Sequence, residues 1–397
     1  APRGSRPLPA DAADLVARIA ALGPTFAHRA PAYDREAAFP TANWDDLRDA
    51  GFLALCIPEA HGGLGADFRT YARVSEELGR WDGSTALTFN MHTATMLLTG
   101  QVADDLDLTD DERAVHEERR AAMWRGVVDE GHIHAQPFSE GLAAGATVGV
   151  GTVARPVEGG WRVTGRKIFA SLSEAADSHN VICKAEGEDR IRFLGIPADS
   201  EGLRIEGDWD PLGMRGTISK NLIMDDVFVP AEREYLPAGA FDQMAARWPY
   251  FYLTLSFTFL GLTRAAIEFS RDYLSGTTGP GDKRQHPQKQ AGWAQMLLAH
   301  ESAQALLYRV VDEAGPDPTP EQLRRAWTAQ VTVMETAPEV ASLAIRICGG
   351  RSLLKPQALE RIYRDARCGA TMLPWSVEIC LDRLGRAGLL DDPATDD

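Results

Sequence analysis

The run KNLIMDDVFVP at residues 220–230 is short, rich in branched apolar residues, and bounded by turn-forming residues. Such runs at regular intervals are typical of a β-sandwich or β-barrel. Five similar runs precede it, separated by Gly, Pro, Asp or Asn: GATVGVGTVARPV (145–157), GWRVTGRKIFAS (160–171), HNVICKAEG (179–187), IRFLGIPA (191–198) and LRIEGDWD (203–210). The sequence therefore predicts a central β domain over residues 131–238.

Helical periodicity surrounds this β region on both sides. Before it, apolar residues recur at three- and four-residue spacing, as in RTYARVSEELGRW (69–81), which predicts an N-terminal helical domain over residues 1–130. After it, four long amphipathic segments predict a four-helix bundle over residues 239–397, because a bundle buries four such faces economically. The expected fold class is α+β and multidomain, with an N-terminal helical domain, a central β-barrel or sandwich domain and a C-terminal four-helix bundle.

The composition excludes several classes of function. The 397 residues carry 41 basic and 57 acidic side chains, a formal net charge of −16. An acidic chain is a poor partner for nucleic acid or for an anionic membrane surface, since both attract clustered Lys and Arg. No segment approaches the roughly 18 apolar residues of a membrane span. We therefore expect neither a nucleic acid nor a membrane as partner.

The cysteines and histidines predict no metal centre. The five cysteines form no CxxC pair, and the nine histidines show no H-x-x-x-H spacing. The start, APRGSRPLPADAADL, lacks the apolar segment of a secretory signal. Together with the odd number of cysteines, this favours a reducing, cytoplasmic location.

Five strings occur in one order along the chain: WDDLRDAGFLALCIPEAHGGLG (44–65), EELGRWDGSTALTFNMHTATM (76–96), GWRVTGRKIFASLSEAAD (160–177), WDPLGMRGTISKNLIMDDVFVP (209–230) and ASLAIRICGGRSLLKPQALERIYRDAR (341–367). In that order they resemble the acyl-CoA dehydrogenase superfamily of flavoprotein dehydrogenases and related flavin monooxygenases. The resemblance covers roughly residues 40–395. It implies the same three-part fold, a flavin cofactor, and a homodimer or homotetramer.

The resemblance also implies which residues meet the flavin ring. Phe138 and Ser139, in the segment FSEG, match a stretch that lies beside the ring. Phe169 matches an aromatic residue that covers one ring face, and Ala170 and Ser171 follow it at the ring edge. The expected cofactor is FAD, with FMN as the alternative.

The match to the family is poorer at the residues expected to contact the cofactor tail. Gly349 and Gly350 match a glycine pair that lets a neighbouring subunit approach the pyrophosphate, because side chains there would block it. The family's R-x-x-F-G segment is absent, and SGTTGPGDKRQHPQ (275–288) stands in its place. Arg284 is the arginine of that stretch and the candidate for the tail.

The usual catalytic base is missing. Dehydrogenases of the family remove the α-proton of an acyl thioester with a glutamate, which lies opposite the flavin in a water-poor site. The two positions that supply this glutamate correspond to Leu373 and Phe251. Neither is acidic, and Glu378, the nearest candidate, comes five residues late. Either the base is elsewhere, or the reaction needs none.

The remaining candidates are weak. His92 and Ser171 are the expected catalytic side chains, as hydrogen-bond partners of substrate or flavin. The expected substrate pocket has five residues: His92, Phe251, Tyr252, Leu373 and Trp375.

Three functions fit these observations. The leading one is α,β-oxidation of an acyl thioester, carried by CoA or a carrier protein, with hydride transfer to FAD. The second is monooxygenation of nitrogen, carbon or sulfur through a C4a-hydroperoxyflavin, with reduced flavin from a partner reductase. The third is a non-catalytic flavoprotein. The missing glutamate opposes the first and favours the second.

Overall fold

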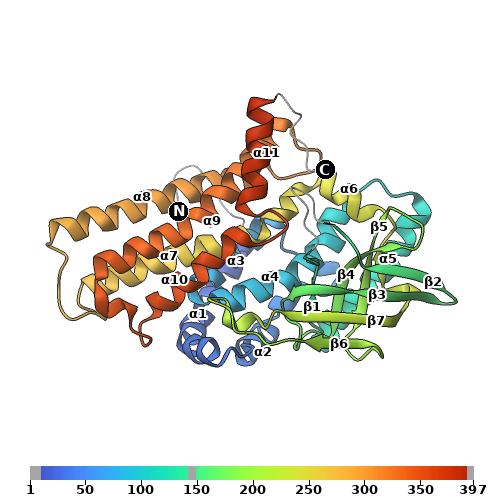
Figure 1. Cartoon of the computed structure of the whole chain (residues 1–397), viewed down its shortest axis with the longest axis horizontal. Coiled ribbons are helices and arrows are strands. Elements are labelled where there is room, and N and C mark those ends of the chain that lie inside the picture. Colours follow the sequence, from blue (N-terminus) through green and yellow to red (C-terminus); the bar gives the residue numbers. More distant parts are fainter. Residues whose placement is uncertain (1–9, 142–148, 391–397) are drawn as a thin grey trace.

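The computed structural model describes residues 10–141 and 149–390 (Figure 1). Part of the expected run at 145–157 lies outside the described residues. So do the first residues of the expected N-terminal domain and the last residues of the expected C-terminal bundle. Within the described part, the order is helices, then a sheet, then helices, so the expected fold class is confirmed.

In the described part of the chain, five α-helices precede the long strands, and side-chain caps fix where the last three of them begin. Asp67 and Asp82 accept hydrogen bonds from the backbone N–H groups of Thr70 and Thr85, and Thr109 forms a capping box with Glu112. The helices are α1 (Ala10–Glu36), α2 (Thr41–Asp49), α3 (Phe68–Trp81), α4 (Gly83–Leu97) and α5 (Asp110–Glu130).

The central strands form one eight-stranded sheet in the order β6-β7-β3-β2-β4-β5-β8, with β1 paired to β4. Its two long strands, β3 and β7, are antiparallel and carry irregular pairing where β3 ends. The strands are β1 (His134–Ala135), β2 (Val153–Val157), β3 (Gly160–Ala170), β4 (Ser178–Ala185), β5 (Ile191–Pro197), β6 (Leu203–Glu206), β7 (Lys220–Pro230) and β8 (Glu234–Leu236).

Between the sheet and residue 390, the structure has six α-helices. They are α6 (Ala240–Arg247), α7 (Thr254–Leu274), α8 (Pro287–Glu313), α9 (Pro320–Cys348), α10 (Ala358–Cys368) and α11 (Val377–Leu389). The four expected amphipathic segments correspond to α7, α8, α9 and α10, which lie side by side in Figure 1. The short helix α11 was not expected from the periodicity.

Two clusters of buried hydrophobic residues hold the helices and the sheet together. One large hydrophobic cluster joins the N-terminal and C-terminal helices, with α3 and α4 packed against α7, while a smaller cluster fills the inner face of the sheet. The short turn Arg215–Thr217, which leads into β7, packs against α4 and α1. Within the described ranges, no helix is both long and apolar enough to cross a membrane.

Candidate active site

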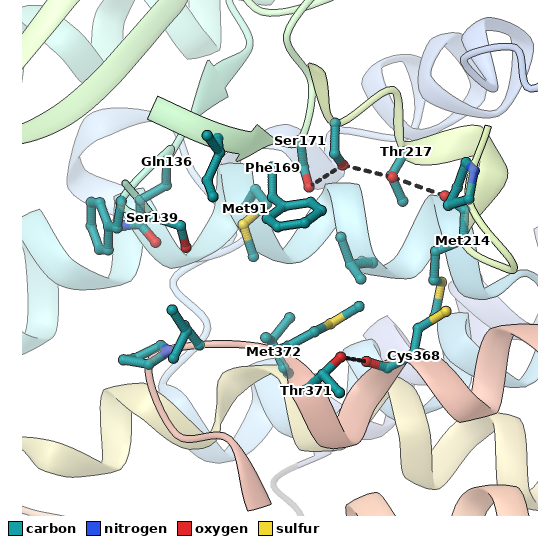
Figure 2. Close-up of a pocket in the computed structure, with 18 of the residues that line it drawn as sticks. Met91, Gln136, Ser139, Phe169, Ser171, Met214, Thr217, Cys368, Thr371 and Met372 are labelled. Atoms are coloured by element: carbon teal, nitrogen blue, oxygen red, sulfur yellow. Dashed lines mark hydrogen bonds between the residues drawn. The ribbon is translucent and has the colours of Figure 1, made fainter. Parts of the chain in front are cut away.

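A cavity of about 670 Å³ lies between the sheet and the helices. This volume suits a cofactor or a small molecule. Figure 2 shows α4 behind it, the end of β3 above it and the segment after α10 below it. Most of its lining side chains are apolar: Leu87, Met91, Phe138, Ile168, Phe169, Trp209, Leu212, Met214, Phe251, Leu255, Met372 and Leu373.

Phe169 projects into this cavity in an unusual way (Figure 2). Its side chain is 66% exposed, and its φ of 51° lies in the left-handed region that non-glycine residues rarely adopt. Its one ring contact is an edge-on contact with Trp209, with ring centres 6.4 Å apart. A strained, exposed ring on a cavity wall is suited to stack against a planar ligand.

Three hydroxyl groups form a chain along the upper wall (Figure 2). The Ser171 and Ser219 oxygens are 2.8 Å apart, and the Ser219 and Thr217 oxygens are 2.7 Å apart. Thr217 donates to the carbonyl oxygen of Met214 at 2.9 Å. The chain brings the end of β3 together with the loop that leads into β7.

Asp365, on α10, holds the end of this chain in place. Its carboxylate accepts a hydrogen bond of 2.6 Å from the backbone N–H of Met214. Burial raises the pKa of Asp365 to about 7, although the nearby guanidinium of Arg361 opposes the rise. The bundle thus fixes the loop that supplies Met214 and Thr217.

A buried ion pair supports the cavity wall beside the end of β3. The amine of Lys167 donates to the carboxylate of Glu140, and both side chains are almost fully buried. Glu140 also accepts hydrogen bonds from Thr152 and from the backbone N–H of Gly151. Burial acts to raise the pKa of Glu140, but Lys167 and these donors outweigh it and hold the pKa below its usual value. The pair fixes the segment that carries Phe138 and Ser139.

The described cavity wall contains no carboxylate. Leu373 and Phe251, at the two expected base positions, both line the cavity, and Tyr252 lies beside them. Glu378 is exposed in the first turn of α11 and does not line the cavity. Arg367 is the one charged side chain among the described lining residues.

Three of the residues expected at the flavin ring or the substrate lie outside the cavity. His92 is fully buried: its Nε2 hydrogen bonds to the Leu53 carbonyl at 2.9 Å, and its Nδ1 accepts from the His134 N–H at 3.0 Å. Both ring nitrogens are therefore occupied, and a direct catalytic role has no support in the geometry. Ala170 is buried in the core of the sheet, and Trp375 packs behind Tyr252 rather than on the cavity wall.

The start of α8 and the end of α9, next to which the expected tail residues lie in the sequence, are at the end of the bundle away from the sheet (Figure 1). Arg284 precedes α8 and is paired with Asp282, while Gly349 and Gly350 follow α9. None lines the cavity. Gly349 has a φ of 88°, and a Cβ at either glycine would meet nothing in this chain within 4 Å. The structure of one chain thus does not bring these residues to the ring site.

Several lining residues were missed by the sequence reasoning. Gln136 is only 8% exposed and its Nε2 has no hydrogen-bond partner, which makes it an unsatisfied polar atom at the cavity. Leu87 and Met91 are four residues apart and share one face of α4, a spacing that could have identified them. Gln136, Thr217 and Ser219 carried no such signal, because only the folded chain brings them to the cavity wall.

Three family models match the chain in order. The N-terminal domain of acyl-CoA dehydrogenase matches residues 18–102, its middle domain residues 139–227, and its C-terminal domain residues 253–373. The chain belongs to the acyl-CoA dehydrogenase family. It is an oxidoreductase of this family, and its cofactor is a flavin.

Two relatives, one named as an acyl-CoA dehydrogenase and one as a nitrososynthase, are similar to this chain over most of its length. The putative acyl-CoA dehydrogenase YdbM of Bacillus subtilis is 28% identical, covering 89% of this chain and 91% of the relative. L-evernosamine nitrososynthase of a Micromonospora species is 27% identical, covering 94% and 90%.

Solved structures share the acyl-CoA dehydrogenase fold with this chain. KijD3 in complex with FMN and an amino-keto sugar nucleotide aligns with a TM-score of 0.83 at 23% identity, covering 97% of this chain and 95% of that one. FMN-bound TdsC from Paenibacillus sp. A11-2 aligns with a TM-score of 0.83 at 22% identity, covering 97% and 99%. At these identities the likeness concerns the fold.

The cavity fits the ring of a flavin. A planar tricyclic ring needs an apolar slot, an aromatic face and polar partners along one edge. Phe169 offers the face, and the unsatisfied amide of Gln136, with Ser139 and Ser171, offers polar atoms on the same wall. Phe138, Ser139, Phe169 and Ser171 remain predictions as flavin contacts.

Proposed function

We propose that this chain is a flavin-dependent monooxygenase that hydroxylates a nitrogen, carbon or sulfur atom of a small molecule, with flavin reduced by a partner reductase. The observation that carries the proposal is the absence of Asp and Glu from the described cavity wall. Leu373 and Phe251 leave no proton acceptor where an acyl-thioester dehydrogenase needs one. An oxygenase has no α-proton to remove.

The bound flavin, once reduced, would supply the electrons that activate O₂, so that one oxygen atom enters the substrate and the other leaves as water. Phe169 would cover one face of the ring, and Gln136, Ser139 and Ser171 would hold its polar edge. Met91, Leu255 and Met372 would exclude water, which protects the activated oxygen from loss as peroxide.

Arg367 supports a substrate that carries an anionic group. It lines the cavity and also a shallow depression on α9 and α10, so it stands between the cavity and the surface. A guanidinium at that place is suited to a phosphate or a carboxylate. The relative named as a nitrososynthase, and KijD3 with its bound sugar nucleotide, favour an amine on such a substrate.

The leading expectation from the sequence, oxidation of an acyl thioester, is the second candidate. The likeness to putative acyl-CoA dehydrogenase YdbM favours it. It requires a relocated carboxylate, and the described wall offers none.

One experiment separates the two. Flavin-loaded protein is titrated without oxygen with acyl-CoA thioesters of several chain lengths, and flavin absorbance is recorded. We expect no bleaching. Separately, the protein with reduced flavin is mixed with ¹⁸O₂ and a panel of amines, sulfides and aromatic compounds, and mass spectrometry follows incorporation of one oxygen atom. We also expect hydrogen peroxide to appear later than oxygen is consumed. Bleaching by an acyl-CoA, with no labelled product, would overturn the proposal.

A further inference from the structure

The hydroxyl chain of Ser171, Ser219 and Thr217 has a direction. All three oxygens belong to buried residues, with exposed fractions of 9%, 6% and 1%, and all three residues line the cavity. The chain ends on the carbonyl of Met214, which can only accept. Because each hydroxyl carries one hydrogen, this end determines the rest.

The direction follows step by step. Thr217 donates its hydroxyl hydrogen to the Met214 carbonyl, so it must accept from Ser219. Ser219 therefore donates its hydrogen to Thr217 and must accept from Ser171. Ser171 donates its hydrogen to Ser219 and presents only lone pairs to the cavity. A ligand atom that meets Ser171 must therefore donate.

We propose that this chain makes Ser171 a fixed hydrogen-bond acceptor, so that the site binds reduced flavin in preference to oxidised flavin. The inference rests on the proposed function, in which flavin arrives reduced. The flavin atom that meets Ser171 in this proposal is the central ring nitrogen N5, because Ser171 lines the cavity two residues after Phe169. N5 carries a hydrogen in reduced flavin and donates. In oxidised flavin the same nitrogen has no hydrogen and only accepts.

Oxidised flavin can satisfy Ser171 only by reversing part of the chain. If Ser171 turns its hydrogen into the cavity, Ser219 must turn toward Ser171, and the 2.7 Å contact between Ser219 and Thr217 is left without a hydrogen. The loss of one hydrogen bond corresponds to a preference of roughly two- to tenfold for the reduced form. Tenfold tighter binding of the reduced form raises a two-electron potential by about 30 mV.

The test measures affinity and potential rather than turnover. Dissociation constants for oxidised and reduced flavin are measured without oxygen, and the potential of the bound flavin is measured by spectroelectrochemistry. In Ser219→Ala, Ser171 loses its acceptor and regains a free hydrogen. In Thr217→Val, Ser219 can turn to Ser171 and release the hydrogen of Ser171. We expect the affinity ratio of oxidised to reduced form to change by roughly two- to tenfold against the reduced form in both variants.

Two further variants serve as controls. Thr217→Ser keeps the hydroxyl that ends the chain and should keep the wild-type ratio. Ser173→Ala removes a buried hydroxyl that donates to the Ile218 carbonyl at 2.7 Å outside the chain, so it should also leave the ratio unchanged. Equal ratios and potentials in all five proteins overturn the inference and leave the proposed oxygenase standing. If neither flavin form binds to folded protein, the proposed function itself fails.

Discussion

Phe169 combines a φ of 51° with a 66% exposed ring at the cavity, and this predicts a role in binding rather than in folding. Phe169→Ala should weaken flavin binding by roughly two- to tenfold, since an aromatic stacking contact is worth roughly 0.5–1.5 kcal/mol. The free energy of unfolding should change by less than about 0.5 kcal/mol, because an exposed side chain buries little. Fluorescence titration and urea unfolding measure the two quantities.

The matched control for this variant is Phe228→Ala. Phe228 is another exposed aromatic of the sheet, 38% exposed on β7, and it does not line the cavity. Phe228→Ala should therefore leave flavin affinity unchanged. Equal weakening by both variants would contradict the role of Phe169.

His92 is expected to act through stability. His92→Leu leaves the Leu53 carbonyl and the His134 N–H without partners in the core. We expect the free energy of unfolding to fall by about 1–3 kcal/mol, the usual cost of a buried unsatisfied group. Flavin affinity of the folded fraction should not change. The exposed His61→Leu is the control, and a variant of wild-type stability that has lost flavin binding would show that His92 acts at the site.

Between elements, Asp365 links α10 to the loop at Met214, and its protonation predicts a pH dependence. Burial raises the pKa of Asp365 from 3.8 to about 7 in the folded chain. The folded state then keeps a proton that the unfolded state releases, so this stabilising contribution is complete below about pH 4 and is lost as pH rises to about 7. The neighbouring Asp82 and Asp34 act in the same direction, while Arg361 opposes them.

This is tested by comparing wild type with Asp365→Asn, which cannot titrate. The unfolding free energy of wild type minus that of the variant should fall as pH rises between about 4 and about 7. Urea denaturation across this range measures it. Asp14→Asn, at an exposed carboxyl of α1, is the matched control. A flat difference for Asp365→Asn would refute the linkage.

The Lys167–Glu140 pair links β3 to the segment that carries Ser139. Lys167→Met should cost about 3–5 kcal/mol, because it leaves a buried carboxylate without its cation. The double variant Lys167→Met/Glu140→Gln should cost less than the sum of the single variants. The exposed pair of Lys220 and Glu174 is the control, with an expected coupling below about 1 kcal/mol in the same double-mutant cycle. Additive effects at Lys167 and Glu140 would contradict the anchoring role.

For the whole molecule, the distance of Gly350 from the ring site predicts a contact made by a second copy. A Cβ at Gly350 meets nothing in this chain, so Gly350→Leu should leave the stability of the single chain unchanged. If a neighbouring chain or the cofactor tail approaches there, the variant should lower the oligomeric mass in light scattering, the affinity for FAD, or both. Unchanged assembly and unchanged FAD affinity would exclude that contact.

The order of helices, sheet and helices could be predicted because periods of two and of 3.6 residues are local properties of the sequence. The resemblance of the sequence motifs to the family also predicted Phe169, Phe251 and Leu373 as site residues, and all three line the cavity. It misplaced His92, which lies one residue beyond Met91 and so about 100° around α4, in the core.

The hydroxyl chain could not be predicted. Ser171 and Ser219 are 48 residues apart and meet only because β3 and β7 pair with a bulge near their ends. No local pattern encodes a contact that depends on the register of two distant strands.

The position of Leu373 has an evolutionary consequence. It lies in the segment between a short turn at residues 369–371 and α11, outside any regular element. A side chain there can be exchanged without breaking a helix or a strand, while Phe169 and the hydroxyl chain stay in place. Lineages that share this scaffold can therefore diverge in reaction chemistry through single substitutions at such a position and retain the same cofactor.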